Sequence, residues 1–286
     1  MPVLAATAGL FRHARRGLAD PSLLPVIERA QANVSLDPRW LAAYRACIGL
    51  PDHPHLPPLA LQIAAAPLHM AILGDARFPF RALGMVHLTQ RVVQTRPLPT
   101  DACFDLRAFC ADARWEKRGM SFGLVTQARC DGEVVWRGET RALAPGKSPA
   151  AVTAPTADAP AEPADVADSE QVLRVPEATG RRYAAIAGDL NPIHQHALLA
   201  RLFGFRRAIV HGTWTLARAL AVAGLPQARG FALDARFRRP VELPSDVVVR
   251  VWCARGGAPA QRILVSPKGG GRTCVDIELV ETTAPN

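Results

Sequence analysis

Two side chains that can exchange protons, the carboxyl group of Asp189 and the imidazole of His194, lie on either side of a predicted turn. Gly188 and Pro192 mark points where a helix cannot continue, so Asp189 and Asn191 are expected on irregular backbone. His194 is then expected to open the next helix. A carboxylate and an imidazole that converge across a tight turn can share one water molecule, which the carboxylate orients while the imidazole exchanges its proton. The spacing therefore indicates acid–base chemistry on water.

A second reactive feature is the backbone at His211-Gly212, where an alanine-rich helix is expected to begin. The first N–H groups of a helix have no partner within it and carry its positive dipole, so they suit a carbonyl oxygen that gains negative charge. Glycine lets such an oxygen approach the backbone closely. Taken alone, Asp189 or His194 is also typical of an Asx turn or a helix cap. Their ordered combination with His211 and Gly212 favours a reactive site.

Helices and strands that would position these residues follow a similar order in both halves of the chain. In the second half we expect a strand at 170–175 and three helices, at 176–187, from His194 to 203 and at 212–223. Strands are then expected at 229–239, 245–255, 261–267 and 273–282. In the first half we expect a helix at 37–47, capped by Asp37, and a buried helix at 59–73. Strands are then expected at 84–95, 102–112, 120–130 and 132–143.

The segment 144–169 separates the two halves. It is rich in proline and alanine and contains no Leu, Ile or aromatic residue, so it cannot bury a core and predicts an exposed linker. The chain then divides into units at 1–143 and 170–286. Short echoes between the halves, such as 96–101 and 239–246, favour a duplicated α+β fold in which a mostly antiparallel sheet wraps round a central apolar helix in each unit.

The stretch from Tyr183 to Gly212 resembles the MaoC-like family, also called hydratase 2 or R-specific enoyl-CoA hydratases. The family pattern, roughly Y-x-x-x-S/T-G-D-x-N-P-I/L-H followed by G-F and I-x-H-G, matches this stretch, and the segment Phe237–Val241 is similar to the family's F-x-x-P-V strand. The resemblance covers most of the second half and implies a hotdog fold. With two copies in one chain, it implies a double hotdog.

The resemblance also implies an activity, the reversible hydration of trans-2-enoyl thioesters to (R)-3-hydroxyacyl thioesters of coenzyme A or acyl carrier protein. In that family the residues matching Asp189 and His194 activate the water and move the proton. Asn191 and His211 would support the site, and the N–H of Gly212 would polarise the thioester carbonyl. No metal or redox cofactor is implied. A hotdog thioesterase and a non-catalytic subunit that binds acyl thioesters remain alternatives.

Candidate substrate-binding residues lie around the same motif. They are Tyr183, Thr213, Arg206, Arg207 and Arg238, of which the arginines could meet the phosphates of the coenzyme or form a solvated basic face. The sequence departs from the family pattern at two positions. Ala187 replaces a small hydroxyl residue, and Thr213 stands where Met is frequent. Both departures bear on substrate preference more than on chemistry.

The first half departs much further from the pattern. If Pro51-x-His53 is aligned with the matching motif of the second half, Ile48 falls at the position of Asp189 and Cys47 at that of Gly188. An alignment on the Leu-Pro-x-Asp echo instead places Pro67, which has no N–H to donate, at the position of Gly212. Either register predicts one active site per chain, with the first half as a fold partner.

Charge and hydropathy limit the classes of binding partner that we expect. The net charge of +9, from 34 Lys and Arg against 25 Asp and Glu, suits an anionic partner. No nucleic-acid-binding motif accompanies the charge, so a nucleic acid is not expected. The longest apolar run, 59–73, is interrupted by polar residues and proline well short of a membrane span. A duplicated hotdog chain can act as a monomer or form a homodimer.

Cysteine usage and the N-terminal sequence bear on the compartment. The six cysteines form no CxxC pair, which predicts neither structural zinc nor a disulfide framework and fits a reducing compartment such as the cytoplasm. The basic residues at 12–16 predict a surface helix in preference to an organellar transit peptide. The histidines outside the motif are expected to be ordinary surface or core residues.

Overall fold

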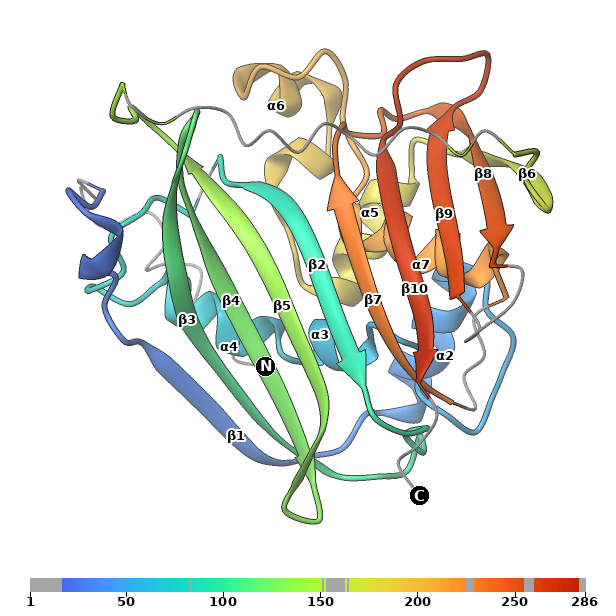
Figure 1. Ribbon diagram of the computed structural model, residues 1–286, viewed down its shortest axis with the longest axis horizontal. Helices are drawn as coiled ribbons and strands as arrows, with labels where there is room; N and C mark the ends of the chain where they lie inside the picture. The colour runs from blue at the N-terminus through green and yellow to red at the C-terminus, as the bar shows by residue number, and fades with distance from the viewer. Residues whose placement is uncertain are drawn as a thin grey trace.

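The backbone forms one antiparallel sheet of ten strands with helices against one face (Figure 1). The strand order is β1-β3-β4-β5-β2-β7-β10-β9-β8-β6. The computed structural model describes residues 17–82, 84–150, 152, 163, 165–224, 229–254 and 260–282. The expected α+β class is confirmed.

The elements of the first half begin with a short 3₁₀ helix, η2. In chain order they are η2 (Pro21–Leu23), β1 (Glu28–Val34), α2 (Pro38–Ile48), α3 (Ala60–Ala64), α4 (Ala66–Leu73), β2 (Val86–Gln94), β3 (Phe104–Glu116), β4 (Gly119–Cys130) and β5 (Glu133–Pro145). As expected, Asp37 caps α2, because its carboxylate accepts from the N–H groups of Arg39 and Trp40.

The second half repeats this plan with one added helical segment, η3 and α6. In chain order its elements are β6 (Ser169–Val175), α5 (Thr179–Ala187), η3 (Pro192–His194), α6 (Ala197–Leu202), α7 (Gly212–Val222), β7 (Gly230–Phe237), β8 (Ser245–Cys253), β9 (Ala260–Pro267) and β10 (Val275–Thr282). Read from its outer edge to the middle of the sheet, the first half has the strand order β1-β3-β4-β5-β2. Read in the same way from the opposite edge, the second half has the matching order β6-β8-β9-β10-β7. The duplication predicted from the sequence is therefore present in the topology.

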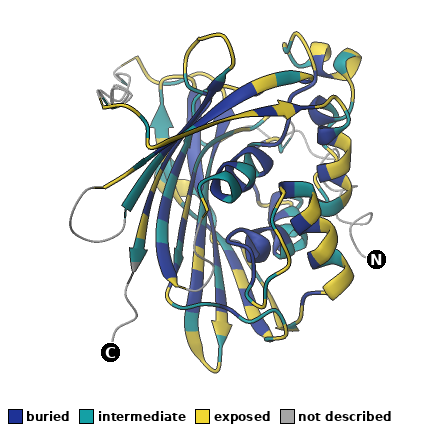
Figure 2. Cartoon of the chain, turned by 90° about the vertical axis from the view of Figure 1, so that its right-hand side faces the viewer, coloured by how far each residue is buried: buried dark blue, intermediate teal, exposed yellow. Residues whose placement is uncertain are grey.

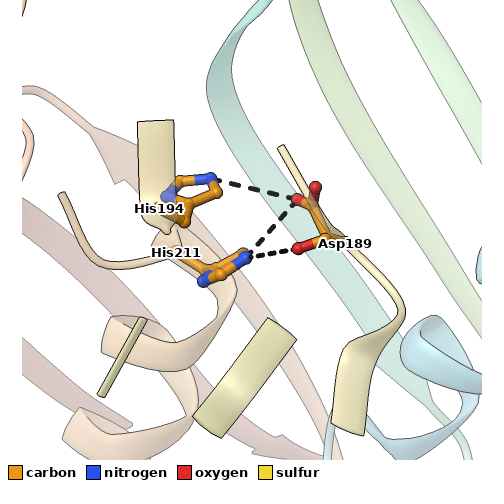
Figure 3. A group of neighbouring side chains, drawn as sticks. All are labelled: Asp189, His194 and His211. Carbon is orange, nitrogen blue, oxygen red and sulfur yellow. Dashed lines mark hydrogen bonds and ion pairs between the residues drawn. The ribbon is translucent and has the colours of Figure 1, made fainter. Parts of the chain in front are cut away.

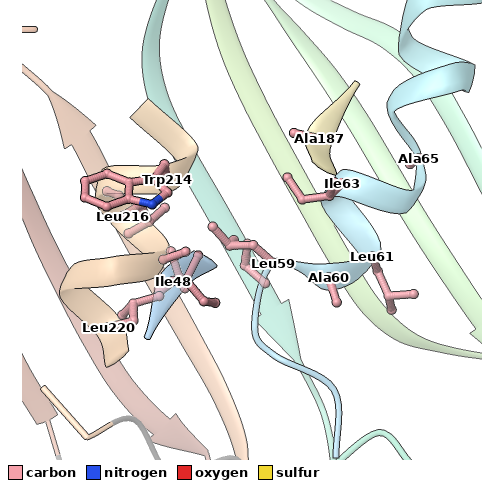
Figure 4. Close-up of a cluster of buried hydrophobic side chains, with 14 of the residues drawn as sticks. Ile48, Leu59, Ala60, Leu61, Ile63, Ala65, Ala187, Trp214, Leu216 and Leu220 are labelled. Carbon is pink, nitrogen blue, oxygen red and sulfur yellow. The ribbon is translucent and has the colours of Figure 1, made fainter. Parts of the chain in front are cut away.

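The sheet curves round its helices, and the side chains between them form a common core. Figure 2 shows the helices nearest the sheet largely buried, while the outer helices present exposed residues to solvent. Ile48 of α2 lies with Leu59, Leu216 and Leu220 in one apolar cluster drawn from both halves (Figure 4). Trp40 and Trp214 add hydrogen bonds across the halves, because their indole N–H groups donate to the carbonyls of Ile186 and Cys47.

The two halves are joined in the middle of the sheet by β2 and β7. Their antiparallel ladder runs from Thr89↔Arg236 to Gln94↔Phe231, and Figure 1 shows the two strands side by side. On its other edge, β2 pairs with β5, where a β-bulge interrupts the register between His87 and Thr89. We call the paired β2 and β7 strands the seam. On the N-terminal side of Thr89, β2 is no longer paired with β7, so the two strands separate at this end of the seam.

Two helix predictions need correction. The expected helix 59–73 is broken at Ala65 into α3 and α4, because Pro67 has no N–H to continue the ladder and fits only in the first turn of a new helix. His194 does not open a helix. It ends the short η3, and α6 begins after His196, whose ring accepts from the N–H of Leu198.

The structure bears on the predictions for the linker, the basic N-terminal segment, the cysteines and a membrane span only within the described residues. Residues 144–145 belong to β5 and Ser169 to β6, while 153–162 lie outside the described residues, so the linker stays a prediction. The basic segment 12–16 also lies outside the described residues. All six cysteines are free thiols. Among the described residues, no helix is both long and apolar enough to cross a membrane.

Replacing Leu216 by Ala tests the shared core. Leu216 is fully buried, so Leu216→Ala should lower the free energy of unfolding by about 2–5 kcal/mol through lost burial and a cavity. The matched control is Leu202→Ala on α6, where the side chain is 79% exposed and little change is expected. Urea unfolding followed by circular dichroism measures both. Equal losses in the two variants would contradict the assigned core.

Candidate active site

The turn after α5 places Asp189 at the start of the site. Gly188 ends α5 in the left-handed region, with φ 72°, a conformation that glycine adopts without strain. The Asp189 carboxylate then accepts from the N–H of Asn191 at 3.1 Å, and the Asn191 side chain caps η3. The Asx turn is thus real, yet it engages only one carboxylate oxygen, Oδ1. The other oxygen, Oδ2, remains available to the site.

His194 is buried and held by one strong contact. Its Nδ1 lies 2.8 Å from the carbonyl oxygen of Ile209. Since a carbonyl oxygen only accepts, Nδ1 carries the proton, and in the neutral ring Nε2 has a free lone pair. That atom faces Asp189 Oδ2 at 4.0 Å (Figure 3). Burial lowers the pKa of His194 below its ordinary value although Asp189 opposes the shift, so the ring is neutral at neutral pH.

His211 lies behind this pair and turns the motif into a three-residue cluster. Its ring stacks on that of His194, with 3.7 Å between the ring centroids. Its Nε2 donates to the backbone carbonyl of Asp189 at 3.1 Å and lies 3.8 Å from Oδ2 of the same residue. Burial, followed by the neighbouring His194, lowers the pKa of His211. The neutral His211 ring is therefore hydrogen-bonded to the Asp189 backbone.

The cluster opens into a cavity of about 270 Å³ between the two halves. Its walls come from the segment Asp189–His194, from the start of α7, from the end of β7 and the loop after it, and from the start of β2. They include Met85, Val86, His87, Asp189, Asn191, Ile193, His194, Phe205, Ile209, Val210, His211, Gly212, Thr213, Thr215, Phe237, Arg238, Arg239, Pro240, Val241 and Val275. A mostly apolar cavity with a few convergent polar groups is the usual form of a small-molecule site.

The geometry suits activation of a water molecule. A water within hydrogen-bond reach of Asp189 Oδ2 and His194 Nε2 would meet a carboxylate and an imidazole lone pair 4.0 Å apart. Gly212 opens α7 on the wall of the same cavity, where its backbone N–H can meet a carbonyl oxygen. Asp189, His194 and Gly212 therefore line one cavity.

A metal ion could use the same donors. One ligand atom each from Asp189, His194 and His211 lies within 4.8 Å of the others, and a carboxylate with two imidazoles is a donor set that transition metals accept. His211 would first have to change its tautomer, because its Nε2 proton is donated to the Asp189 carbonyl. The cluster as it stands is arranged for hydrogen bonds.

The predicted substrate-binding residues divide into two groups. Thr213 and Arg238 line the cavity, and Arg238 is held by the buried carboxylate of Asp276 at 3.1 Å. Arg206 and Arg207 are exposed and are not among the lining residues. Tyr183 also lies outside the cavity. It is fully buried behind His211, at 5.1 Å between ring centroids, so it packs against that ring and does not line the cavity.

Three contributors to the site were not identified from the sequence. A Cβ at Gly180 in α5 would overlap the carbonyl oxygen of His194, so this glycine lets α5 pass close to His194. The sequence could have pointed to Gly180, because glycine inside a predicted helix is unfavourable unless packing requires it. Phe237 and His87 line the cavity from β7 and β2. Nothing local marked His87, which was expected to be an ordinary surface or core histidine.

The first-half register also needs correction. Gly49 ends α2 in the left-handed region as Gly188 ends α5, so Leu50, not Ile48, stands at the position of Asp189, and Gly49, not Cys47, at that of Gly188.

At the start of the central helix, the bridges His55↔Pro99 and Ile209↔Glu242 are equivalent, which places Pro58, not Pro67, at the position of Gly212. The segment with η3 and α6 is missing between these points. In that half, the described residues therefore provide no counterpart of the Asp189–His194 pair and no N–H at the carbonyl-binding position.

Comparisons with known proteins identify the family of the chain and its fold. A family model described as a MaoC like domain matches residues 156–266. The chain is 32% identical over 248 residues to 3-hydroxyacyl-thioester dehydratase X of Mycobacterium tuberculosis, covering 82% of this chain and 86% of that protein.

Among solved structures, HtdX of M. tuberculosis superposes with a TM-score of 0.73 at 27% identity, covering 88% of this chain and 99% of that one. A MaoC-like dehydratase from Phytophthora capsici gives 0.74 at 19% identity, covering 92% and 98%, and shows the same fold.

The contact between Gly180 and His194 can be tested without an assay of activity. Gly180→Ala should displace η3, lower the thermal midpoint and admit water to His194, so that the pKa of that ring rises toward its ordinary value. Histidine ring NMR titration measures the shift. Gly146→Ala is the matched control, because a Cβ there meets open space. Unchanged stability and titration in Gly180→Ala would contradict the close packing.

Proposed function

Because the chain belongs to the MaoC-like dehydratase family, we propose that it catalyses the reversible hydration of trans-2-enoyl thioesters to 3-hydroxyacyl thioesters. The observation that carries the assignment to particular residues is the free Nε2 of His194, facing Asp189 Oδ2 across 4.0 Å on the wall of the cavity. The catalytic residues of the proposal are Asp189 and His194.

Hydration begins with a water held between the two catalytic side chains. Asp189 orients the water, and His194 Nε2 takes up a proton as the water oxygen bonds to C3 of the enoyl group. The electron pair of the C2=C3 bond moves toward C2 and the carbonyl, and C2 then receives the proton that His194 Nε2 took from the water, so the enzyme ends in its starting protonation state. Dehydration is the same path reversed.

The thioester carbonyl gains negative charge during this step. The N–H of Gly212 would donate to its oxygen, helped by the dipole of α7. Asn191 supports the turn that carries Asp189, and His211 fixes the Asp189 backbone through its carbonyl. No electron transfer occurs, so the proposal requires no redox cofactor.

The proposed substrate is a thioester of coenzyme A or of acyl carrier protein. Arg238 and the exposed Arg239 stand at the cavity wall, where a positive charge can meet a phosphate. The (R) configuration of the 3-hydroxy product follows from the family resemblance and belongs to the proposal. One chain contains both hotdog units, so it can act as a monomer or as a homodimer with one active site in each chain.

The assignment is tested by the loss of enoyl-thioester absorbance with crotonyl-, octenoyl- and dodecenoyl-coenzyme A. Asp189→Asn and His194→Ala should each lower kcat/KM by about 10²–10⁴, because each removes a group of the acid–base pair. His53→Ala is the matched control, a histidine substitution in the half without the motif, and should retain activity.

A parallel thiol assay separates the alternatives. Absorbance loss without thiol release supports hydration, whereas release of free thiol from a saturated acyl thioester would indicate a thioesterase. Tight binding with no turnover of any enoyl thioester would indicate a binding subunit. Loss of activity in a folded His53→Ala variant would contradict a single site in the second half.

The pH profile tests the protonation state of His194. The ring must be neutral to accept a proton, and burial lowers its pKa, so kcat/KM for hydration should hold through pH about 6.5 and fall only at lower pH. Initial rates between pH 4.5 and 8, with circular dichroism at each pH to confirm folding, measure this limb. An acidic limb centred above pH about 6.5 would show that His194 is not the base.

A further inference from the structure

We propose that His87, supplied by the first half, is a positioning residue that holds the Phe237 ring against Gly212 and so fixes the carbonyl-binding end of the site. This inference rests on the proposed function. It gives the half that lacks the catalytic motif a defined part in the reaction.

The first step of the argument is the seam between the halves. The β2–β7 ladder ends at Thr89↔Arg236, and past this pair Phe237 of β7 and His87 of β2 line the cavity. On β2 the bulge between His87 and Thr89 breaks the register with β5 and sets the direction of the His87 side chain. The cavity therefore opens where the two strands part, with one ring from each half.

The two rings are in contact. The centroids of His87 and Phe237 lie 4.3 Å apart at an interplanar angle of 44°. Phe237 also lies close to Gly212, where an added Cβ would be 3.0 Å from the ring carbon Cε1. Phe237 thus contacts both an imidazole from the first half and the first residue of α7. Any shift of Phe237 would change the space beside the N–H that receives the thioester carbonyl.

His87 is itself fixed and uncharged. Its Nε2 lies 3.0 Å from the carbonyl oxygen of Thr89 and must donate to it, so the ring is tied to its own strand. Burial lowers the pKa of His87 to about 4, although Thr89 and Asp189 oppose the shift. The neutral ring therefore packs on Phe237 as an uncharged aromatic neighbour, tilted by 44°.

A direct acid–base role for His87 is the competing explanation, since it lines the cavity and interacts electrostatically with Asp189. The two roles require different properties of the side chain. Positioning needs a flat ring that packs on Phe237, whereas proton transfer needs a ring nitrogen. Phenylalanine retains the first property and lacks the second, so His87→Phe separates them.

The experiment measures kcat and KM for an enoyl-coenzyme A in His87→Ala, His87→Phe, Phe237→Leu and the double variant His87→Ala/Phe237→Leu. His87→Ala should lower kcat about tenfold, with KM and the pH profile little changed, because the loss falls on the transition state. His87→Phe should remain within about threefold of the original enzyme. The double variant should lose about as much as the worse single variant, because the two rings act as one unit.

His53→Ala serves as the control within the first half, and thermal unfolding confirms that each variant is folded. The proposal is overturned if His87→Phe is as impaired as His87→Ala, if the acidic limb of the pH profile moves in His87→Phe, or if the two single losses multiply in the double variant. These outcomes leave the hydratase activity of the original enzyme intact. Absence of turnover in the original enzyme would overturn the proposed function and this inference together.

Discussion

The hydrogen bond from His194 Nδ1 to the carbonyl of Ile209 is the contact on which the site depends. It is buried, measures 2.8 Å and fixes both the tautomer and the orientation of the ring. Because the proton is held on Nδ1, the lone pair of Nε2 points to Asp189. The chain must therefore bring Ile209 back to His194 after η3 and α6, and the small apolar cluster of Ile193, Ala200 and Ile209 achieves this. The helical segment absent from the first half is the part of the fold that makes this contact.

Duplication gives the molecule two similar units with different tasks. The second half has the loop that carries Asp189 and His194, the proposed acid–base pair. In the first half, the short loop after α2 is held instead by the guanidinium of Arg45, which donates to the carbonyls of Pro51, His53 and His55. That half still contributes β2, whose early residues line the cavity. The sheet is thus symmetric in topology, whereas the chemistry lies on one side of its seam.

The motif and the fold were accessible from the sequence because they depend on local signals. Gly188, Pro192 and Gly212 mark turns and a helix start, and alternating or alanine-rich stretches mark strands and the central helix. The remaining features depend on packing between distant segments. Tyr183 belongs to the matching motif but lies behind His211, outside the cavity. His87 reaches the site only because a bulge and the end of a ladder lie beside each other, and no local pattern reports that arrangement.

The seam strands also determine how the site responds to dilution. In an assembly of two separate hotdog subunits, a cavity with walls from both would be lost when the subunits dissociate. The fraction of protein with a formed cavity would then depend on protein concentration. Here β2 and β7 belong to one polypeptide, so the local concentration of each half around the other is set by the chain and not by the solution. The cavity at the end of the seam therefore stays assembled at any concentration at which the chain is folded.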